Sequence, residues 1–316
     1  MIGARIGLSV PLAHGTGAGR AQMAEWFARA DASGLDSLWV LDQLIGRMPT
    51  PGPVGVLGFA AAMTERVRLG TAVYVVPGRN PIAAAKELAT LDSLAGGGRL
   101  VVGVGSGNRA HFPTFGLGCA HDGPPAPRDV LDEFLEVLPR LWREADVHHP
   151  GPLWPMDGVT LSPHPAVPPA LWVGGGAPAA LRRALRFGSG WIGAGRHSTA
   201  EFAELAARFR ALCAEAGRPD MAVGKRVYLL VEGDRARARA TIEEWFGTFY
   251  RRPELGATVT VAGDAAECLE QLEALTAAGA TDLILHPLAE TAAQQDLVFD
   301  ALLPALAGYR TAATPA

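Results

Sequence analysis

The amino-acid sequence predicts a (β/α)8 barrel, or TIM barrel, with insertions after its fourth and seventh strands. Short apolar runs of the kind found in buried parallel strands recur eight times, and a segment of helical periodicity follows each of them. The 316 residues also exceed the about 250 of a typical barrel. The surplus gathers in three segments, at 108–127, 145–169 and 250–280. We therefore expect one domain over 1–316.

The first four strand-helix units occupy the N-terminal half of the chain. We expect strands over 5–11, 37–42, 68–74 and 99–107, and helices over 20–33, 54–64, 81–94 and 128–144. The fourth helix, RDVLDEFLEVLPRLWRE, has the most clearly amphipathic pattern. Segment 108–127, rich in Pro, Gly and His, separates it from its strand as a long loop.

The last four units follow a Pro- and Trp-rich insertion. We expect strands over 170–176, 191–195, 225–233 and 282–288, and helices over 177–188, 199–216, 234–249 and 292–307. Segment 145–169 is expected to hold a small hairpin with GVTL as one arm, and 250–280 to end in an extra helix, AAECLEQLEALTAAG. An open, doubly wound sheet is the alternative, because periodicity does not show closure.

Composition excludes several classes of partner. A net charge of −4 and 19% charged residues give no basic surface for nucleic acid or an anionic membrane. The apolar runs are too short for a membrane span or a signal peptide, so we expect a cytoplasmic protein that acts on a small molecule. The three cysteines lie far apart, which argues against a disulfide framework and against a C-x-x-C pair.

Two predicted strands end in glycine-rich turns that could bind a cofactor. RLVVGVGSGN resembles a dinucleotide fingerprint, but Asn108 holds the last glycine's place and no helix follows directly, so we interpret Gly103, Gly105 and Gly107 as room for a flat ring beside the backbone. In WVGGGAPAALRRA, three glycines lead into a helix with Pro178 in its first turn. Free N–H groups at such a helix start favour phosphate binding; a simple tight turn is the alternative.

The remaining strand ends carry few acids or bases. No H-E-x-x-H or G-x-S-x-G motif is present, and a pocket of this kind suits a cofactor that carries the reactive electrons itself. His14 and His286 follow the first and last strands and are the candidates for acid-base catalysis, ahead of His111 and His197. The pair His148-His149 lacks ligand partners at metal spacing, so we predict a solvated turn there and no metal site.

Three stretches together resemble the luciferase-like flavin family, especially its branch that depends on the deazaflavin coenzyme F420. They are GLDSLWVLDQL, the long run RVRLGTAVYVVPGRNPIAAAKELATLDSLAGGGRLVVGVGSG, and LWVGGGAPAALRRALRFGSGWI. The resemblance is most specific over 67–107, where two strands and a helix follow in the family's order and spacing. It implies the same (β/α)8 barrel that the periodicity predicts.

The resemblance also implies a cofactor site at the C-terminal mouth of the barrel. A non-proline cis peptide bulges there from the third strand, at the position of Ala72 and Val73. The residues implied to bind the cofactor are Asp42, Ala72, Val73, Tyr74, Ser106, Gly107, Asn108, Gly175, Gly176 and Ala177. Arg79, in the loop after the third strand, is either a further contact to an anionic cofactor group or a surface cation.

Gln43 departs from the pattern of the F420-dependent relatives. Many of them have His after the aspartate that corresponds to Asp42, and a glutamine has no proton to exchange at neutral pH. Gln43 still suits a hydrogen bond to a ring or substrate carbonyl. Asn108 likewise stands where relatives often have an acid, so either the substrate needs no protonation from these sites or another group supplies the proton.

The sequence therefore predicts an oxidoreductase that transfers hydride between F420 and a small organic substrate. The alternatives are an FMN-dependent monooxygenase that uses reduced flavin and O2, and a non-catalytic flavin-binding protein. A phosphate-binding aldolase without flavin is disfavoured, because no predicted strand ends in lysine. By resemblance we expect a homodimer, served by a separate flavin or F420 reductase.

Overall fold

Eight parallel strands close into a barrel, which confirms the predicted fold and excludes the open sheet. The computed structural model describes residues 2–11, 19–46, 49–117 and 126–311. The barrel strands are β1 (Arg5–Ser9), β2 (Ser37–Val40), β3 (Arg68–Val75), β4 (Leu100–Gly105), β7 (Ala170–Gly174), β8 (Gly190–Gly193), β9 (Ala222–Val231) and β11 (Asp282–Pro287). Each pairs with its neighbour in this order, and β11 returns to β1.

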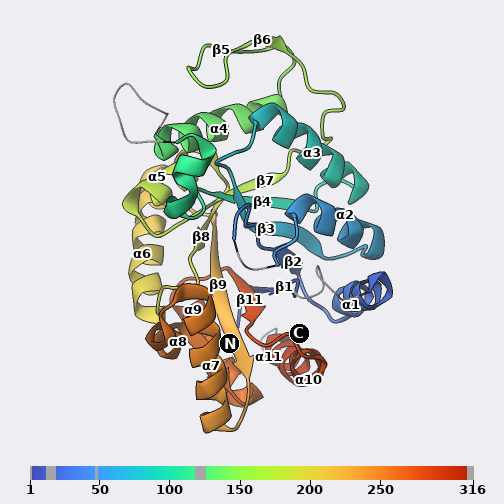
Figure 1. Cartoon of the computed structure of the whole chain (residues 1–316), viewed down its shortest axis with the longest axis vertical. Helices are drawn as coiled ribbons and strands as arrows, with labels where there is room; N and C mark the ends of the chain where they lie inside the picture. The colour runs from blue at the N-terminus through green and yellow to red at the C-terminus, as the bar shows by residue number, and fades with distance from the viewer. Residues whose placement is uncertain (1, 12–18, 47–48, 118–125, 312–316) are drawn as a thin grey trace.

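Helices surround the barrel and agree with the predicted ranges to within about one turn (Figure 1). They are α1 (Arg20–Ala32), α2 (Pro53–Met63), α3 (Pro81–Leu94), α4 (Pro127–Leu141), α5 (Pro178–Phe187), α6 (Thr199–Glu215), α9 (Ala265–Ala277), α10 (Ala292–Asp296) and α11 (Leu303–Thr311). A π-helical turn, η3 (Leu297–Leu302), joins α10 to α11. Four of these helices begin at proline. Proline is suited to a first turn because the N–H that it lacks would have no hydrogen-bond partner within the helix there.

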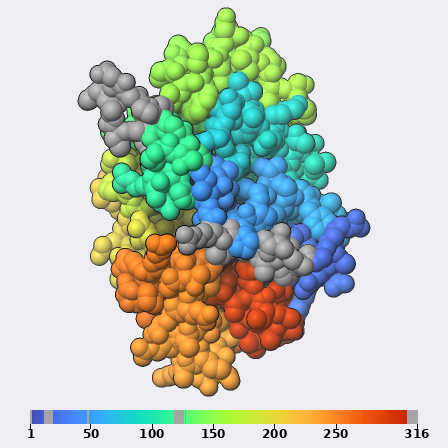
Figure 2. Space-filling model, in the orientation of Figure 1, coloured from blue at the N-terminus to red at the C-terminus, as the bar shows by residue number. Residues whose placement is uncertain are grey.

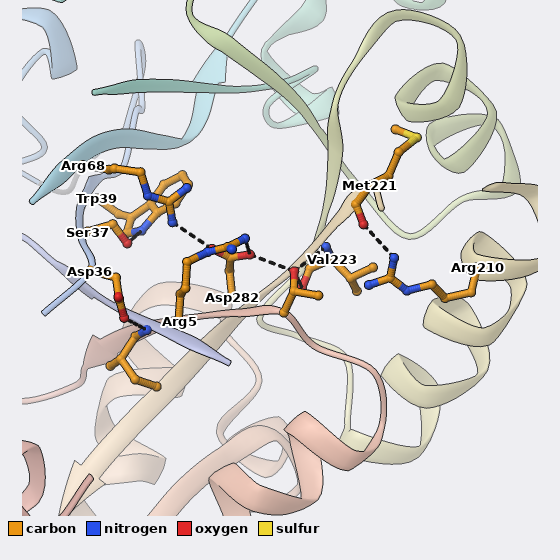
Figure 3. A network of polar contacts seen from close by, with 11 residues as sticks. Arg5, Asp36, Ser37, Trp39, Arg68, Arg210, Met221, Val223 and Asp282 are labelled. Carbon is orange, nitrogen blue, oxygen red and sulfur yellow. Dashed lines mark hydrogen bonds and ion pairs between the residues drawn. The ribbon is translucent and has the colours of Figure 1, made fainter. Parts of the chain in front are cut away.

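Charged side chains close the N-terminal end of the barrel (Figure 3). The buried Asp282 of β11 accepts hydrogen bonds from Arg5 of β1 at 2.7 and 2.8 Å and from Arg68 of β3 at 2.9 Å. These contacts tie the last strand to the first and to the third. Above them lie two tryptophans in contact, Trp39 and Trp172, whose ring centroids are 5.5 Å apart and whose planes are tilted by 37°.

The glycines of the lower barrel make room for this tryptophan pair. A Cβ on Gly7 would lie 2.4 Å from Trp39 Nε1, and one on Gly70 would lie 2.5 Å from the same ring. The indole N–H of Trp39 donates to Ser37 Oγ at 2.8 Å. The interior is therefore filled at this level, and only its C-terminal mouth is left to bind ligands.

A 3-10 helix, η2 (Arg109–Phe115), lies between β4 and α4, and the predicted hairpin, formed by β5 (Val147–His149) and β6 (Met156–Val159), lies between α4 and β7. The hairpin projects beyond α4 at one end of the molecule (Figures 1 and 2). The predicted solvated turn at His148-His149 is wrong. His149 is buried, because its Nε2 lies 3.2 Å from Glu133 Oε1 on α4 and anchors the hairpin there.

The seventh unit differs from the prediction in which helix joins the outer ring. We expected helix 234–249 to belong to the ring and helix 265–279 to be extra. Instead, α9 packs between α6 and the C-terminal helices on the outer side of β9. The helix α7 (Arg235–Tyr250) covers the opposite face of β9, together with α8 (Pro253–Val259) and the added strand β10 (Thr260–Gly263). Helical periodicity predicts that a helix has an apolar face, but it does not predict which face of the sheet that helix packs against.

In Figures 1 and 2 the orange segment that contains α7 lies beside the red C-terminal helices. Among the residues that the structure describes, no helix is both long and apolar enough to cross a bilayer.

Candidate active site

The mouth of the barrel is shaped first by a bulge in β3. The peptide bond between Ala72 and Val73 is cis, as the resemblance implies, and the pairing register with β4 shifts at this point. The Val73 side chain occupies the space over two neighbouring strands, because a Cβ on Gly105 would lie 2.7 Å from it and one on Gly174 2.5 Å from it. These glycines therefore accommodate Val73. The predicted approach of a ring to them stays a prediction.

An ion pair holds the end of β3 in place. Asp42, after β2, accepts from the Val75 N–H at 2.8 Å and from Arg79 at 2.7 Å, and its side chain is 2% exposed. Burial raises the pKa of the Asp42 carboxyl, while the Val75 N–H and Arg79 oppose that rise. Arg79 also covers the Tyr74 ring at 3.9 Å from its centroid. Asp42 and Arg79 thus position backbone, and the Tyr74 ring lies in the core between barrel and helices, not at the mouth.

Polar residues after β2 and β4 line the edge of the mouth. The Gln43 side chain is exposed, and the Thr50 hydroxyl donates to its Oε1 at 3.3 Å. Asn108 is used locally, because its side chain accepts from the Ala110 N–H at 3.0 Å and caps η2. Ser106 is half-buried and Gly107 exposed. His14 lies outside the described residues, so its predicted role has no structural test.

The turn after β7 has the features of an anion cradle. Gly175 has a φ of +136°, a conformation that L side chains rarely adopt. Its carbonyl accepts from Trp191 Nε1 at 2.6 Å, and its N–H donates to the Ile192 carbonyl at 3.1 Å. Ala177, the N-cap of α5, makes no side-chain cap, so no capping side chain competes for the first N–H groups of the helix.

A loop after β8 stands against this cradle. A Cβ on Gly176 would lie 2.2 Å from the His197 ring. Only glycine at this position therefore lets the turn after β7 contact the loop after β8. Lys225 of β9 secures the loop, because its buried Nζ donates to the carbonyls of Ala194 and His197 at 2.8 Å each. Burial lowers the pKa of Lys225 to about 7. The pKa of His197 is also lowered, mainly by burial and then by the charge of Lys225.

Three polar groups of the barrel interior lack partners within the described chain: Ser9 Oγ, Arg226 Nε and His286 Nδ1, all buried. They belong to β1, β9 and β11, which are neighbours in the sheet. Burial lowers the pKa of His286 well below 6.5, and the charge of Arg226 lowers it further. His286 is therefore neutral at pH 7 and able to accept a proton.

The helix α7 adds an aromatic wall on the same side. Trp245 lies 5.8 Å from the His286 ring, edge to face, and stacks on Phe249 at 4.1 Å. Tyr228 of β9 packs edge to face on His286 at 5.7 Å, and its hydroxyl hydrogen-bonds that of Tyr250. Sequence reasoning missed this wall and missed Arg226. The run WFGTFY, with four aromatics in six residues, was the available signal.

These features fit a phosphate-bearing cofactor with a flat ring. The turn of Gly175 to Ala177 would hold the phosphate, and the β3 bulge with Val73 would support the ring. Neither element presents an acidic side chain that would repel a phosphate, and a Cβ in the cradle would be strained or would collide. The neutral His286 and the cationic Arg226 would then be left to meet a substrate.

Comparison with known proteins identifies relatives. The family profile described as luciferase-like monooxygenase matches residues 5–255. An F420-dependent glucose-6-phosphate dehydrogenase of Kineococcus radiotolerans is 30% identical over 179 residues, which are 54% of this chain and 51% of that protein. An F420-dependent hydroxymycolic acid dehydrogenase of Mycobacterium tuberculosis is 29% identical over 67% of this chain and 59% of the relative. The match thus spans about half the length of such relatives.

Solved structures share the fold over nearly the whole chain. An F420-dependent secondary alcohol dehydrogenase in complex with an F420–acetone adduct has a TM-score of 0.80 at 21% identity, and the alignment covers 96% of this chain and 99% of that one. The oxygenating constituent of 3,6-diketocamphane monooxygenase from Pseudomonas putida, in complex with FMN, has a TM-score of 0.75 at 16% identity, covering 95% and 98%. At these identities the likeness shows the fold alone.

Proposed function

The chain belongs to the luciferase-like monooxygenase family, and we propose that it is an F420-dependent oxidoreductase that transfers hydride between the deazaflavin and a small organic substrate. The observation that carries the proposal is the glycine cradle before α5 beside a mouth whose interior holds a neutral histidine. The names of the curated relatives support F420 as the coenzyme.

The cofactor, when bound, supplies the hydride donor or acceptor at its C5 carbon. The residues of the chain hold the cofactor and the substrate in position. Gly175 shapes the turn, Gly176 and Ala177 bind the phosphate with backbone N–H groups, and Lys225 keeps His197 packed against Gly176. Asp42 fixes the end of β3, so that Val73 presents a rigid surface to the ring. Rigid placement of both reactants is the main contribution that such a barrel makes to the rate.

His286 is the residue we assign to proton transfer. Its buried Nδ1 has no partner in the described chain, and its lowered pKa keeps it neutral. It accepts the proton of a substrate hydroxyl as hydride leaves the carbon, and returns that proton when the reaction runs toward the alcohol. This assignment replaces the acid-base role that Gln43 is unable to take.

An FMN-dependent monooxygenase is the second candidate. Gln43, in place of the histidine of many F420-dependent relatives, favours it, and the same fold binds FMN in the Pseudomonas putida oxygenase. Both candidates would use the same cradle, because both cofactors carry a phosphate.

Dependence on oxygen separates the two. The purified protein is incubated with reduced F420 and a panel of small ketones and enones under strict anaerobiosis, and oxidised F420 is followed by its visible absorbance. Substrate-dependent oxidation without O2 is the expected result. Turnover that requires FMN, a flavin reductase and O2 would instead establish the monooxygenase.

A further inference from the structure

The three unpartnered polar atoms of the barrel interior lie on three neighbouring strands near the same level. In register, Ser9 and His286 follow directly on the paired residues Leu8 and Leu285, so they lie level on adjacent strands. Arg226 is paired with Ile284, one interior position below His286. Its side chain reaches upward, because the guanidinium carbon lies 5.0 Å from the centroid of the Tyr228 ring, which packs against His286.

The charge of Arg226 is not neutralised by the described chain. No carboxylate there forms an ion pair with it, whereas Asp42 and Asp282 are both occupied by other arginines. A buried guanidinium nitrogen without a partner costs folding free energy, so its presence in the interior calls for a ligand that bonds it. Ser9, level with His286 on the next strand, offers a hydroxyl donor.

A single positive charge matches a monoanion. The neighbouring cation, Lys225, does not add to it, because its Nζ is turned to the carbonyls of Ala194 and His197. A guanidinium presents parallel N–H groups that pair with both oxygens of a carboxylate. A dianionic phosphate would leave charge uncompensated at this position.

We infer that the substrate of this site carries a carboxylate, held by Arg226 and Ser9 beside His286, with a planar apolar part against Trp245 and Phe249. Trp245 of the aromatic wall contacts His286, and Arg226 lies one interior position below it, so a conjugated or aromatic acid spans both. The inference rests on the proposed function in taking this pocket as the substrate site, but it makes no use of the cofactor's identity.

Benzoate and benzamide, which have nearly the same shape and differ in charge, are the probes. Isothermal titration calorimetry measures the affinity of the full-length protein for each, without cofactor and again with F420. We expect benzoate to bind at least tenfold more tightly than benzamide, because a charge-assisted pair is lost in the amide. In Arg226→Gln this preference disappears, and in Arg226→Lys part of it remains.

Arg235→Gln is the matched control, because Arg235 is 92% exposed and should leave the preference unchanged. Ser9→Ala serves as a second variant if Arg226→Gln does not fold, with an expected loss of severalfold in benzoate affinity.

Equal binding of the two probes by the wild type, or an unchanged preference in Arg226→Gln, would overturn the inference. So would a loss of F420 affinity in Arg226→Gln with benzoate binding intact, since Arg226 would then serve the cofactor. Failure of F420 to bind leaves the benzoate comparison valid, so the two proposals fail separately.

Discussion

His286 is the residue on which the proposed chemistry depends. It is 2% exposed, and its environment combines burial, the nearby charge of Arg226 and two aromatic edges. All of these favour the neutral imidazole. The residue is therefore built to accept a proton at a pH at which an ordinary histidine would be partly charged.

Replacing His286 by glutamine keeps a polar side chain but removes the proton acceptor. We expect kcat with F420 to fall by about 10²-fold or more, while F420 affinity changes little. In the wild type, the rate of alcohol oxidation should stay level between about pH 8 and pH 6.5 and fall only as His286 protonates at lower pH. An unchanged kcat in His286→Gln, or a wild-type midpoint at or above pH 6.5, would contradict the assignment.

Gly175 tests the phosphate cradle. We expect Gly175→Val to weaken F420 binding at least tenfold, because its φ of +136° disfavours any side chain and a Cβ would lie 3.0 Å from Ala180. The measurement is quenching of tryptophan fluorescence. Gly217→Val is the matched control: Gly217 has a φ of +68° with open space around it at the end of α6. Equal F420 affinity in both variants would show that the cradle does not bind the cofactor.

At this scale the sequence singled out His286, Asp42 and the glycine turn as candidates, because residue type and place at a strand end carry that information. It did not separate binding from support. Asp42 and Arg79 pair with each other, a fact that depends on the β3 bulge and the loop after it. Arg226 went unnoticed because alternation within a strand does not tell which charged side chain lacks a counter-ion.

Among the elements, the loop between β8 and α6 links the core to the cradle. Lys225 donates hydrogen bonds to two carbonyls of this loop, and the His197 ring of the loop packs against Gly176. The fold thus uses a buried ammonium on the outer face of β9 to support a binding turn after β7.

We expect Lys225→Met to weaken F420 binding by about threefold to tenfold and to destabilise the fold by about 1–3 kcal/mol, because buried carbonyls lose their donor. Lys86→Met is the control, since Lys86 donates to a carbonyl, that of Ser162, at the surface. Fluorescence titration and urea unfolding give the two quantities. Unchanged cofactor affinity would separate the loop from the cradle.

Lys225→Met should also change how the free energy of unfolding depends on pH. The pKa of Lys225 is about 7 in the fold against 10.5 for an ordinary lysine. Between these values the unfolded chain binds more protons, so the free energy of unfolding should rise with pH in the wild type. Lys225→Met should lack that contribution.

The order of strands and helices followed from periodicity, but the placement of α7 did not. Both α7 and α9 have an apolar face, and the sequence order favoured α7 as the ring helix. The length of β9 decides otherwise: its upper part extends past β8, pairs with β10 and leaves its inner face to α7. Strand length and pairing are properties of the closed sheet and are not visible in one segment.

For the molecule as a whole, closure at the N-terminal end rests on Asp282. Asp282→Asn should lower the free energy of unfolding by about 2–3 kcal/mol, because Arg5 and Arg68 lose their shared counter-ion while keeping some access to water. Urea unfolding measures it. Arg29→Gln, which breaks the exposed pairs of Arg29 with Asp296 and Asp300, is the control and should cost about 1 kcal/mol or less. Equal losses in both would mean that the network does not hold the barrel closed.

The barrel itself was predictable because eight repeats of one pattern leave few arrangements that bury every strand. The homodimer and the separate reductase stay predictions. What the whole molecule presents to a ligand is a filled lower interior, the proposed phosphate cradle after β7, and the inferred carboxylate site on β1, β9 and β11 with the aromatic wall of α7 beside it.

The most direct test of the account is a titration of the purified protein with F420 and, separately, with FMN, followed by tryptophan fluorescence. The account predicts saturable binding of F420 that is at least tenfold tighter than that of FMN. A preference for FMN, or no binding of either cofactor, would contradict the proposed use of F420.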